Sequence, residues 1–203
     1  MNCLAGCELR DILSELDLTV QDLFADGNGN GMQKPQIVAT YDYVDEKGAL
    51  LYQVVRMDPK GFRQRRPSGS GWDWSLGNAR RVLYRLPRVV AEVGSSGTVV
   101  VVEGEKDVLN LERVGKVATT CSGGAGRWQG EFSRVLAGAG RVAVIADDDE
   151  PGRKHAFRIG GSLLLAGLPR ERLGLFLPVG KDVSAHLGAG LLLSALRPLG
   201  EEP

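Results

Sequence analysis

The sequence lacks several features that would place it in a specialised class of protein. It has three cysteines among 203 residues, an odd number that does not make a disulfide framework. No apolar run approaches the roughly 18 residues of a membrane span, and no secretory signal precedes the first polar residues. We therefore expect a protein of the reducing cytoplasm without a membrane partner.

The chain also lacks a net charge. Its 25 basic and 25 acidic residues balance, which argues against a generic polycation. An apolar content of 43% is enough for a real core, and the length suits one domain of ordinary size with a smaller attachment. The overall balance conceals a strong difference in charge between segments, described below.

Two apolar, β-branched runs stop abruptly at acidic residues: residues 98–107, TVVVVEGEKD, and residues 141–152, RVAVIADDDEPG. Each is typical of a buried parallel strand that carries carboxylates at its C-terminal end, where open α/β sheets bind ligands. The side chains expected to converge there are Glu103, Asp107, Asp147 and Asp149. Gathered carboxylates suit Mg²⁺ or Mn²⁺, which usually handle phosphates. The pattern predicts a metal-dependent phosphoryl-transfer site.

Strand-like and helix-like patterns alternate from residue 98 onward. The expected strands cover residues 99–102, 117–120, 141–146 and 173–177, and the expected helices cover residues 106–114, 128–137, 151–166 and 191–196. This alternation favours an α/β fold in which a mainly parallel sheet is flanked by helices. His155 and His186 fall in this region, and we expect them on helix surfaces rather than in a catalytic role.

The first 34 residues are expected to form a helical lead that ends in a flexible linker, GNGNG, at residues 27–31. Cys3 and Cys7 have the spacing of half a zinc site. A structural zinc needs four ligands, and the other half of such a site is missing. We therefore expect no zinc in this chain and treat the two cysteines as free thiols.

A small basic subdomain follows, in which residues 37–44 and 49–57 are predicted to form a β-hairpin. From residue 56 to residue 88, nine basic residues less two acidic ones leave a local charge of +7. Phe62, Trp72 and Trp74 lie among them. One hypothesis is that these arginines and aromatic rings bind single-stranded nucleic acid. The other is a solvated basic surface with its tryptophans in a small core, and we expect at least one of the two to be buried there.

A glycine-rich loop, CSGGAG, occupies residues 121–126 between an expected strand and an expected helix. Its backbone N–H groups could approach a phosphate, but it matches neither GxGxxG nor the GxxxxGK[ST] loop. A turn that simply packs a helix closely is the other interpretation. Both remain open.

The acidic pair of motifs, EGE-x-D after a strand and D-x-D followed by EPGRKHA, resembles the Toprim domain of topoisomerases and bacterial-type primases. Residues 38–87, with QVVRMDPKGFRQRRP and RRVLYRLP, are similar to the segment before Toprim in primases of phages and mobile elements. The resemblance implies four parts: a lead over residues 1–34, a basic primase-like subdomain over 35–95, a Toprim catalytic domain over 96–188, and a C-terminal helix and tail over 189–203.

The resemblance also implies roles for individual residues. Catalytic roles are assigned to Glu103, Asp107, Asp147 and Asp149, and metal ligation to Glu103, Asp147, Asp149 and Asp182. Glu103 would be a general base or a further ligand. Ser184 departs from the pattern, because primases often have another acid there. An acid at a strand end can instead stabilise the next helix through its dipole, which is the alternative for each carboxylate.

Three functions fit these features. The first is a primase-type nucleotidyltransferase that makes short RNA from ribonucleoside triphosphates on single-stranded DNA, with a separate replicative helicase because the chain has no GxxxxGK[ST] motif. The others are a metal-dependent nuclease and a non-enzymatic nucleic-acid-binding adaptor. The residues expected to contact nucleic acid or nucleotide are Arg63, Arg65, Arg66, Arg80, Arg81, Lys106, Arg153, Lys154 and Lys181.

Overall fold

The structure is a computed structural model that describes residues 13–15, 35–124 and 126–200. The chain divides into two compact units, Met1–Gln36 and Ile37–Pro203, and the expected boundary at residues 95 and 96 stays a prediction. Cys3, Cys7 and the linker at residues 27–31 lie outside the described residues. Among the helices of the described part, none has the length and apolar character needed to span a bilayer.

The first sheet is a four-stranded meander, and its strands lie side by side in chain order. Its strands are β1 (Gln36–Val44), β2 (Leu50–Asp58), β3 (Gly61–Ser68) and β4 (Gly71–Asp73). The predicted hairpin is confirmed by β1 and β2. Strands β3 and β4 were not predicted, because β3 buries no residue and so lacks the apolar alternation of a strand. It forms by antiparallel pairing with β2.

The second sheet has the strand order β6-β5-β7-β8-β9. Its strands are β5 (Thr98–Val101), β6 (Val117–Thr119), β7 (Arg141–Ile145), β8 (Leu173–Leu177) and β9 (Arg197–Pro198). The first four are parallel, as predicted, and only β9 pairs antiparallel. Val99, Val100 and Val101 are buried, which explains why β5 is an unbroken apolar run.

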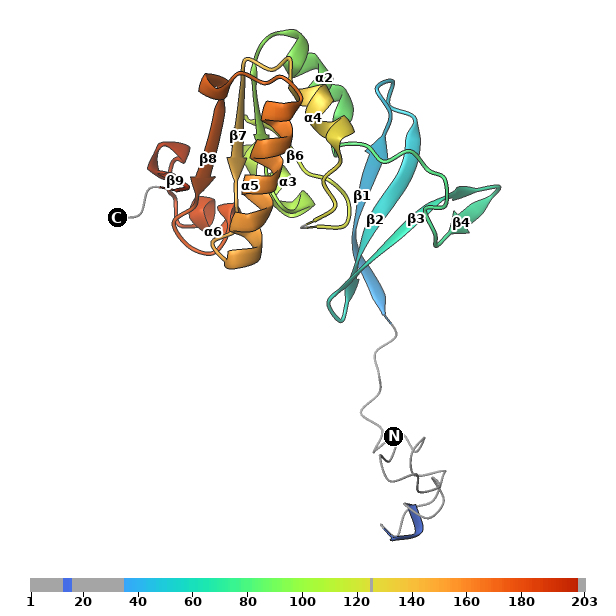
Figure 1. The fold of residues 1–203 in the computed structure, drawn as a ribbon. Helices are drawn as coiled ribbons and strands as arrows, with labels where there is room; N and C mark the ends of the chain where they lie inside the picture. Colours follow the sequence, from blue (N-terminus) through green and yellow to red (C-terminus); the bar gives the residue numbers. More distant parts are fainter. Residues whose placement is uncertain (1–12, 16–34, 125, 201–203) are drawn as a thin grey trace. The chain divides into compact units, whose positions relative to one another are not determined.

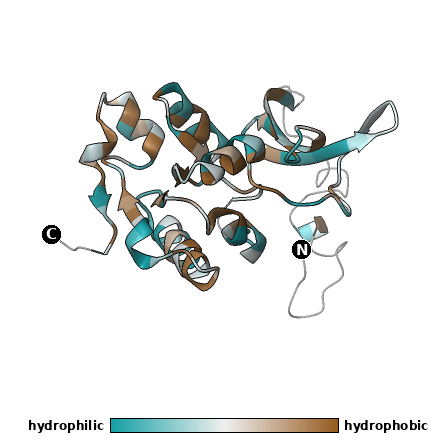
Figure 2. Ribbon diagram, turned by 90° about the horizontal axis from the view of Figure 1, so that it is seen from above, coloured by the Kyte–Doolittle hydropathy of each residue, from teal (hydrophilic) through white to brown (hydrophobic). Residues whose placement is uncertain are grey.

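Helices cover both faces of the second sheet (Figure 1). They are α2 (Leu86–Gly94), α3 (Glu105–Arg113), α4 (Gly130–Leu136), α5 (Glu150–Leu165) and α6 (Val183–Gly188). The chain moves from β5 to β6 in one direction and from β6 to β7 in the other, so right-handed crossovers place α3 and α4 on opposite faces. Helices α2, α4 and α5 pack together, and α6 packs on α3. Hydrophobic and hydrophilic residues alternate along the helices in Figure 2.

The structure corrects two expectations for the helices. A helix was expected at residues 191–196, but only a 3₁₀ turn forms there, Leu193–Ala195, and the regular helix α6 ends earlier at Gly188. Gly190, with φ of 75°, takes the left-handed conformation that ends a helix. Helix α2 was not predicted, although Leu86, Val89 and Val93 recur at helical spacing.

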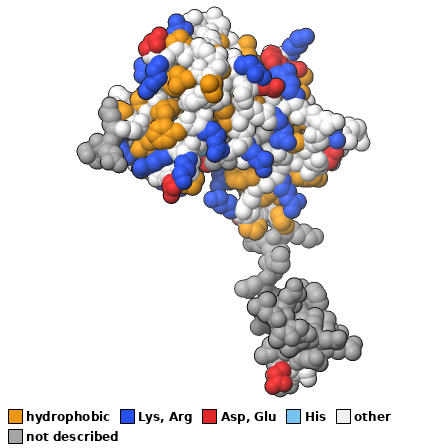
Figure 3. All heavy atoms as spheres, in the orientation of Figure 1, with side chains coloured by type: hydrophobic (Ala, Val, Ile, Leu, Met, Phe, Trp, Pro, Cys, Tyr) orange, Lys and Arg blue, Asp and Glu red, His pale blue; other side chains and the backbone are white. Residues whose placement is uncertain are grey.

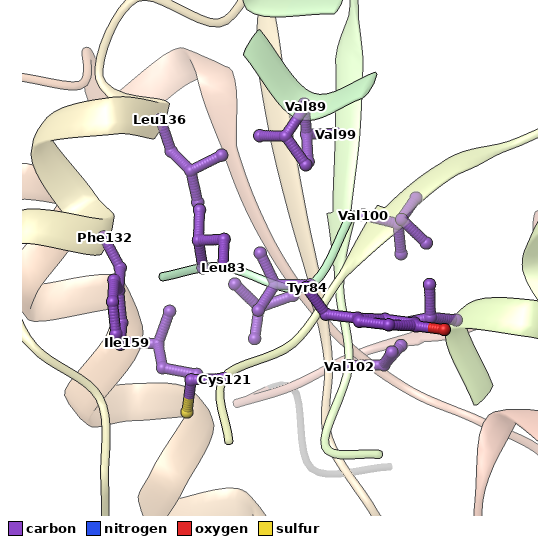
Figure 4. Packing of buried hydrophobic residues seen from close by; sticks show 14 of the residues in the cluster. Leu83, Tyr84, Val89, Val99, Val100, Val102, Cys121, Phe132, Leu136 and Ile159 are labelled. Carbon is purple, nitrogen blue, oxygen red and sulfur yellow. The ribbon is translucent and has the colours of Figure 1, made fainter. Parts of the chain in front are cut away.

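The meander and the parallel sheet share one hydrophobic core. Tyr43 and Tyr52 stack with ring centroids 4.6 Å apart, and Tyr84 lies 5.2 Å from Tyr43. Figure 4 shows Leu83 and Tyr84 within this core, close to Val99 and Val100 of β5, to Val102 just after it, and to the buried side of α4. The segment that leaves the meander is therefore an internal part of the α/β layer.

Two buried hydrogen bonds tie the tyrosines of the meander to the residues that follow β5 and β6. Tyr43 Oη donates to Glu105 Oε1 over 2.7 Å, and Tyr52 Oη lies 3.1 Å from Ser122 Oγ. Glu105 is the first residue of α3 and is 8% exposed. Burial raises the pKa of this carboxyl, while the hydrogen bond from Tyr43 opposes the rise. The contact fixes the start of α3 against β1.

Replacing Tyr43 with Phe should destabilise the protein by about 1–3 kcal/mol, because it leaves the buried Glu105 carboxyl without this donor. Urea denaturation followed by circular dichroism measures the loss. Tyr41→Phe is the matched control, since the Tyr41 hydroxyl makes no hydrogen bond with another described residue. Equal stability of the Tyr43 and Tyr41 variants would show that the bond contributes nothing.

Candidate active site

A crevice of about 1110 Å³ lies between the meander and the carboxyl ends of the parallel strands. One wall comes from the meander and includes Tyr41, Arg56 and Phe62. The opposite wall comes from the α/β layer and contains the carboxylates Glu103, Glu105, Asp107, Asp147 and Asp182. Acidic side chains from three separate strand ends therefore line one opening.

Parallel strands place these carboxylates together. Glu103 follows β5, Asp147 follows β7 and Asp182 follows β8, and the three strands run in the same direction side by side. The start of α5 approaches Asp147 so closely that a Cβ on Gly152 would lie 2.6 Å from the Asp147 carbonyl oxygen. Glycine is required there for α5 to begin beside the site.

Burial and mutual repulsion make these carboxyls hard to ionise. Burial raises the pKa of Asp147 to about 7, and the charges of Glu103, Asp107 and Asp182 add to the rise. The pKa of Glu103 is also raised, by burial first and then by the charges of Asp149 and Asp107. Among the described residues, no donor bonds to the carboxylate of Glu103 or of Asp147; Thr120 Oγ1 donates only to the backbone carbonyl of Glu103. Negative charge is therefore concentrated on the carboxylate wall of the crevice.

Asp107 is held by the residue that departs from the acidic pattern. Ser184 Oγ donates a hydrogen bond to Asp107 Oδ1, and Asn110 Nδ2 donates to Ser184 Oγ over 2.6 Å. Burial raises the pKa of Asp107, and the hydrogen bond from Ser184 opposes this rise. Ser184 therefore orients the Asp107 carboxylate, whereas an acid at position 184 would have added a further negative charge.

Helix capping accounts for two of the predicted ligands. Asp149 Oδ1 accepts from Gly152 N and Asp182 Oδ1 from Ala185 N, each over 2.7 Å, so each caps a helix. Asp149 is exposed and is not among the residues that line the crevice, although its charge acts on Glu103. Across residues 13–15, 35–124 and 126–200, no three His, Cys, Asp or Glu side chains form a ready set of metal ligands.

The structure separates the nine predicted nucleic-acid contacts into three groups. Arg81, Lys106 and Lys181 line the crevice. Four others form ion pairs: Arg66 with Asp73, Arg80 with Glu46, Arg153 with Asp148, and Lys154 with Glu150. Arg63 and Arg65 lie over tryptophan rings.

Three further cations, Arg56, Lys60 and Arg127, line the crevice and were missed as site residues. Arg56 alternates along β2 with the same parity as Val54, which also lines the crevice, so strand periodicity could have found it. Arg127 follows the glycine-rich loop, and no spacing in the sequence marks it. Figure 3 shows many Lys and Arg side chains and few acidic ones across the middle of the face in view.

The glycine-rich loop borders the crevice through Ser122, Gly123 and Gly124. His155 helps to hold it, because its Nδ1 accepts from Gly126 N over 3.2 Å. The expectation that His155 and His186 lie on helix surfaces is wrong, since both are buried. His186 Nδ1 accepts from Val179 N over 3.0 Å and so orders the turn before α6.

The expectation that a tryptophan of the basic segment is buried is also wrong. Trp72 is 39% exposed and Trp74 is 48% exposed. The residues that close the small core are the tyrosines of β1 and β2 instead. The two indole rings are thus available at the surface of the meander.

Solved structures of primase domains have a fold similar to that of this chain. The structure matches a DNA primase domain from Pseudomonas aeruginosa with a TM-score of 0.58 and 22% identity, covering 74% of this chain and 46% of that one. It matches the DnaG primase catalytic domain bound to ssDNA with a TM-score of 0.57 and 20% identity, covering 79% of this chain and 53% of that one. It matches the RNA polymerase domain of Mycobacterium tuberculosis DnaG with a TM-score of 0.54 and 18% identity, covering 94% of this chain and 67% of that one. These likenesses confirm the predicted α/β fold.

In sequence, the chain is 32% identical over 101 residues to the Gene 57 protein of Mycobacterium phage D29. The match covers 50% of this chain and 62% of the phage protein. No protein-family model matches the sequence.

The raised pKa of Asp147 predicts a pH-dependent cost to stability. An aspartate of ordinary pKa 3.8 has lost its proton in the unfolded chain well below pH 7, whereas the folded protein retains it up to about pH 7. Stability contributed by this group is therefore lost as the pH rises from about 4 to 7. In metal-free buffer, Asp147→Asn should melt at a higher temperature than the wild type. The difference between the two melting temperatures should widen from pH 5 to pH 7 and then stay constant.

Asp148→Asn is the control for this experiment, because Asp148 is paired with Arg153 and Arg197 and its loss should not raise the melting temperature. Thermal unfolding by calorimetry across this pH range gives the comparison. A wild type that melts above Asp147→Asn at pH 8 would contradict the prediction.

Proposed function

We propose that this chain is a primase-type nucleotidyltransferase that makes short RNA on single-stranded DNA. The observation that carries the proposal is the crevice, in which Glu103 and Asp147 face cations such as Arg81 across one opening. A fold shared with primase catalytic domains, one of them bound to ssDNA, supports the same assignment. The chain spans between 46% and 67% of the three solved primase chains described above, so the proposal concerns the catalytic portion.

The basic side chains of the crevice suit the binding of phosphates, and the acidic ones suit the reaction itself. Arg56 and Lys60 on the meander, together with Arg81 and Arg127, would hold the phosphates of a template strand or of incoming ribonucleotides. Lys106 and Lys181 lie on the acidic side and would contact phosphates nearer the reacting atoms. Arg66, Arg80, Arg153 and Lys154 are engaged in ion pairs, so we expect smaller contributions from them.

Divalent metal suits the acidic wall by its chemistry. Glu103 and Asp147 offer carboxylate oxygens without other hydrogen-bond partners in the described residues, and their mutual repulsion would fall once a cation binds. We propose that Asp147 and Glu103 hold Mg²⁺ or Mn²⁺, with Asp107, Asp149 and Asp182 assisting. When bound, the ion would neutralise charge on the transferring phosphate. Zinc is not part of the proposal.

Within this arrangement, the protein's own side chains would orient the carboxylates and deprotonate the attacking hydroxyl. As the alternative to ligating the ion, Glu103 would accept the proton of the attacking hydroxyl, because its raised pKa makes it a stronger base than an ordinary glutamate. The hydrogen bonds from Asn110 through Ser184 hold Asp107 in one orientation. Unwinding of duplex DNA would come from a separate helicase.

A non-enzymatic adaptor is the second candidate, and one observation favours it. The described carboxylates do not form a ready set of three metal ligands, and two of them cap helices. A crevice of this kind could grip phosphates without catalysing transfer.

Incubation with single-stranded DNA, four ribonucleotides and Mg²⁺ or Mn²⁺ separates the candidates. We expect new short RNA that disappears in Asp147→Asn and persists in Asp148→Asn. Loss should exceed about a hundredfold, since a group that stabilises the transition state contributes several kcal/mol. Shortened template would indicate a nuclease, and binding without either product would indicate the adaptor; both results contradict the proposal.

The basic side chains that line the crevice give an independent prediction. Arg81→Ala and Arg127→Ala should each weaken binding of single-stranded DNA and lower the slope of log affinity against log salt by about 0.7 per lost contact. Arg80→Ala is the matched control, because its guanidinium is paired with Glu46 and lies outside the crevice lining. Fluorescence anisotropy over a salt series measures both quantities. Equal slopes in the wild type and both crevice variants would remove these arginines from the interface.

A further inference from the structure

The meander has a second functional face, because β3 alternates between the crevice and the opposite side. Phe62 and Gln64 line the crevice, and so do their cross-strand partners Arg56 and Val54. The intervening residues of a strand point to the other face of the sheet. Arg63 and Arg65 therefore lie on the face of the meander that turns away from the carboxylates.

On that face a row of side chains crosses the sheet and ends on an indole ring. Gln53 Nε2 donates to Asp42 Oδ1 over 2.6 Å, and Arg65 Nε donates to Gln53 Oε1 over 2.7 Å. The guanidinium carbon of Arg65 then lies 4.0 Å from the centroid of the Trp72 ring. Arg65 is thus held from behind by Gln53 while it covers Trp72, an arrangement that reduces the entropy lost on binding.

Trp74 connects this face to the crevice. Its ring lies 5.3 Å from the Arg65 guanidinium carbon and 6.0 Å from that of Arg63, yet Trp74 also lines the crevice. Trp72 is not among the lining residues. The two half-exposed indoles therefore mark a continuous route from the crevice, over the edge of β4, to the opposite face.

The chemistry of this surface favours an unpaired nucleic-acid strand. Exposed indoles stack on bases of any sequence, and neighbouring arginines supply positive charge for the backbone. Two carboxylates of the meander, Asp42 and Asp73, are already bonded to Gln53 and Arg66, which limits their repulsion of a polyanion. The hairpin of β3 and β4 is largely hydrophilic in Figure 2.

We infer that single-stranded nucleic acid leaves the crevice over Trp74 and that its next bases stack at Trp72 and Arg65 on the opposite face of the meander. This inference rests on the proposed function, since it assigns a path to the strand that the crevice holds. Short strands would occupy the crevice and Trp74 alone. Longer strands would reach Trp72 as well and bind more tightly.

Binding of labelled oligothymidylates of about 4 to 20 nucleotides tests the path. As the oligothymidylate is lengthened, the affinity of the wild type should rise a second time once the strand reaches Trp72 on the face of the meander opposite the crevice. Trp72→Ala should lose that step, a fall of about 5- to 150-fold that corresponds to roughly 1–3 kcal/mol of stacking, whereas Trp74→Ala should weaken binding at every length. Trp72→Phe should restore most of the step. Phe157→Ala, at another exposed aromatic residue on α5, is the matched control and should bind like the wild type.

Each outcome decides the inference. A Trp72→Ala variant that is folded by circular dichroism and binds long strands like the wild type would overturn it, even if the wild type makes primers. If Trp72→Ala lost binding to polyglutamate but still bound oligothymidylate like the wild type, the inference would be overturned in favour of an acidic protein partner. A length step that depends on Trp72 supports the path even if no primer forms, in which case the proposed catalysis fails alone.

Discussion

Burial of β5 and β7 on both faces is the constraint on which the rest of the structure depends. Helices cover each side of the sheet, so these strands carry apolar side chains between their ends and tolerate charge only where they enter or leave the sheet. Glu103 and Asp147 lie at those points of emergence. Because the strands are parallel neighbours, their carboxylates meet, and the raised pKa values of both groups are the electrostatic consequence.

The meander gives this acidic edge its opposite wall. Its tyrosines belong to the same core as the valines of β5, and Tyr43 is bonded to Glu105 at the start of α3. The meander therefore cannot shift without disturbing the helix that carries Asp107. Arg56 and Phe62 are held facing the carboxylates in consequence, while Arg65 and Trp72 are displayed on the other side.

Sequence patterns predicted the parallel strands well because two-sided burial leaves a strong apolar signal, as in residues 98–102. They failed for β3, whose residues are partly or fully exposed and whose strand conformation comes from pairing with β2. They failed for both histidines for a related reason. A polar side chain can be buried once its ring nitrogen finds a backbone N–H, as His155 does at Gly126, and no local pattern records that partner.

By itself, the sequence determined the four parallel strands, the helices α3, α4 and α5 between them, and the acidic residues at the strand ends, because these follow from short-range periodicity. Tertiary structure decided which charges share the crevice. It brought Arg127 into the same crevice as the carboxylates, paired Arg80 with Glu46, and left Asp149 as a helix cap outside the crevice lining. It also decided that Trp72 and Trp74 are exposed. The physical reason is that ion pairs, burial and stacking depend on distances between residues far apart in the chain, which composition and spacing do not contain.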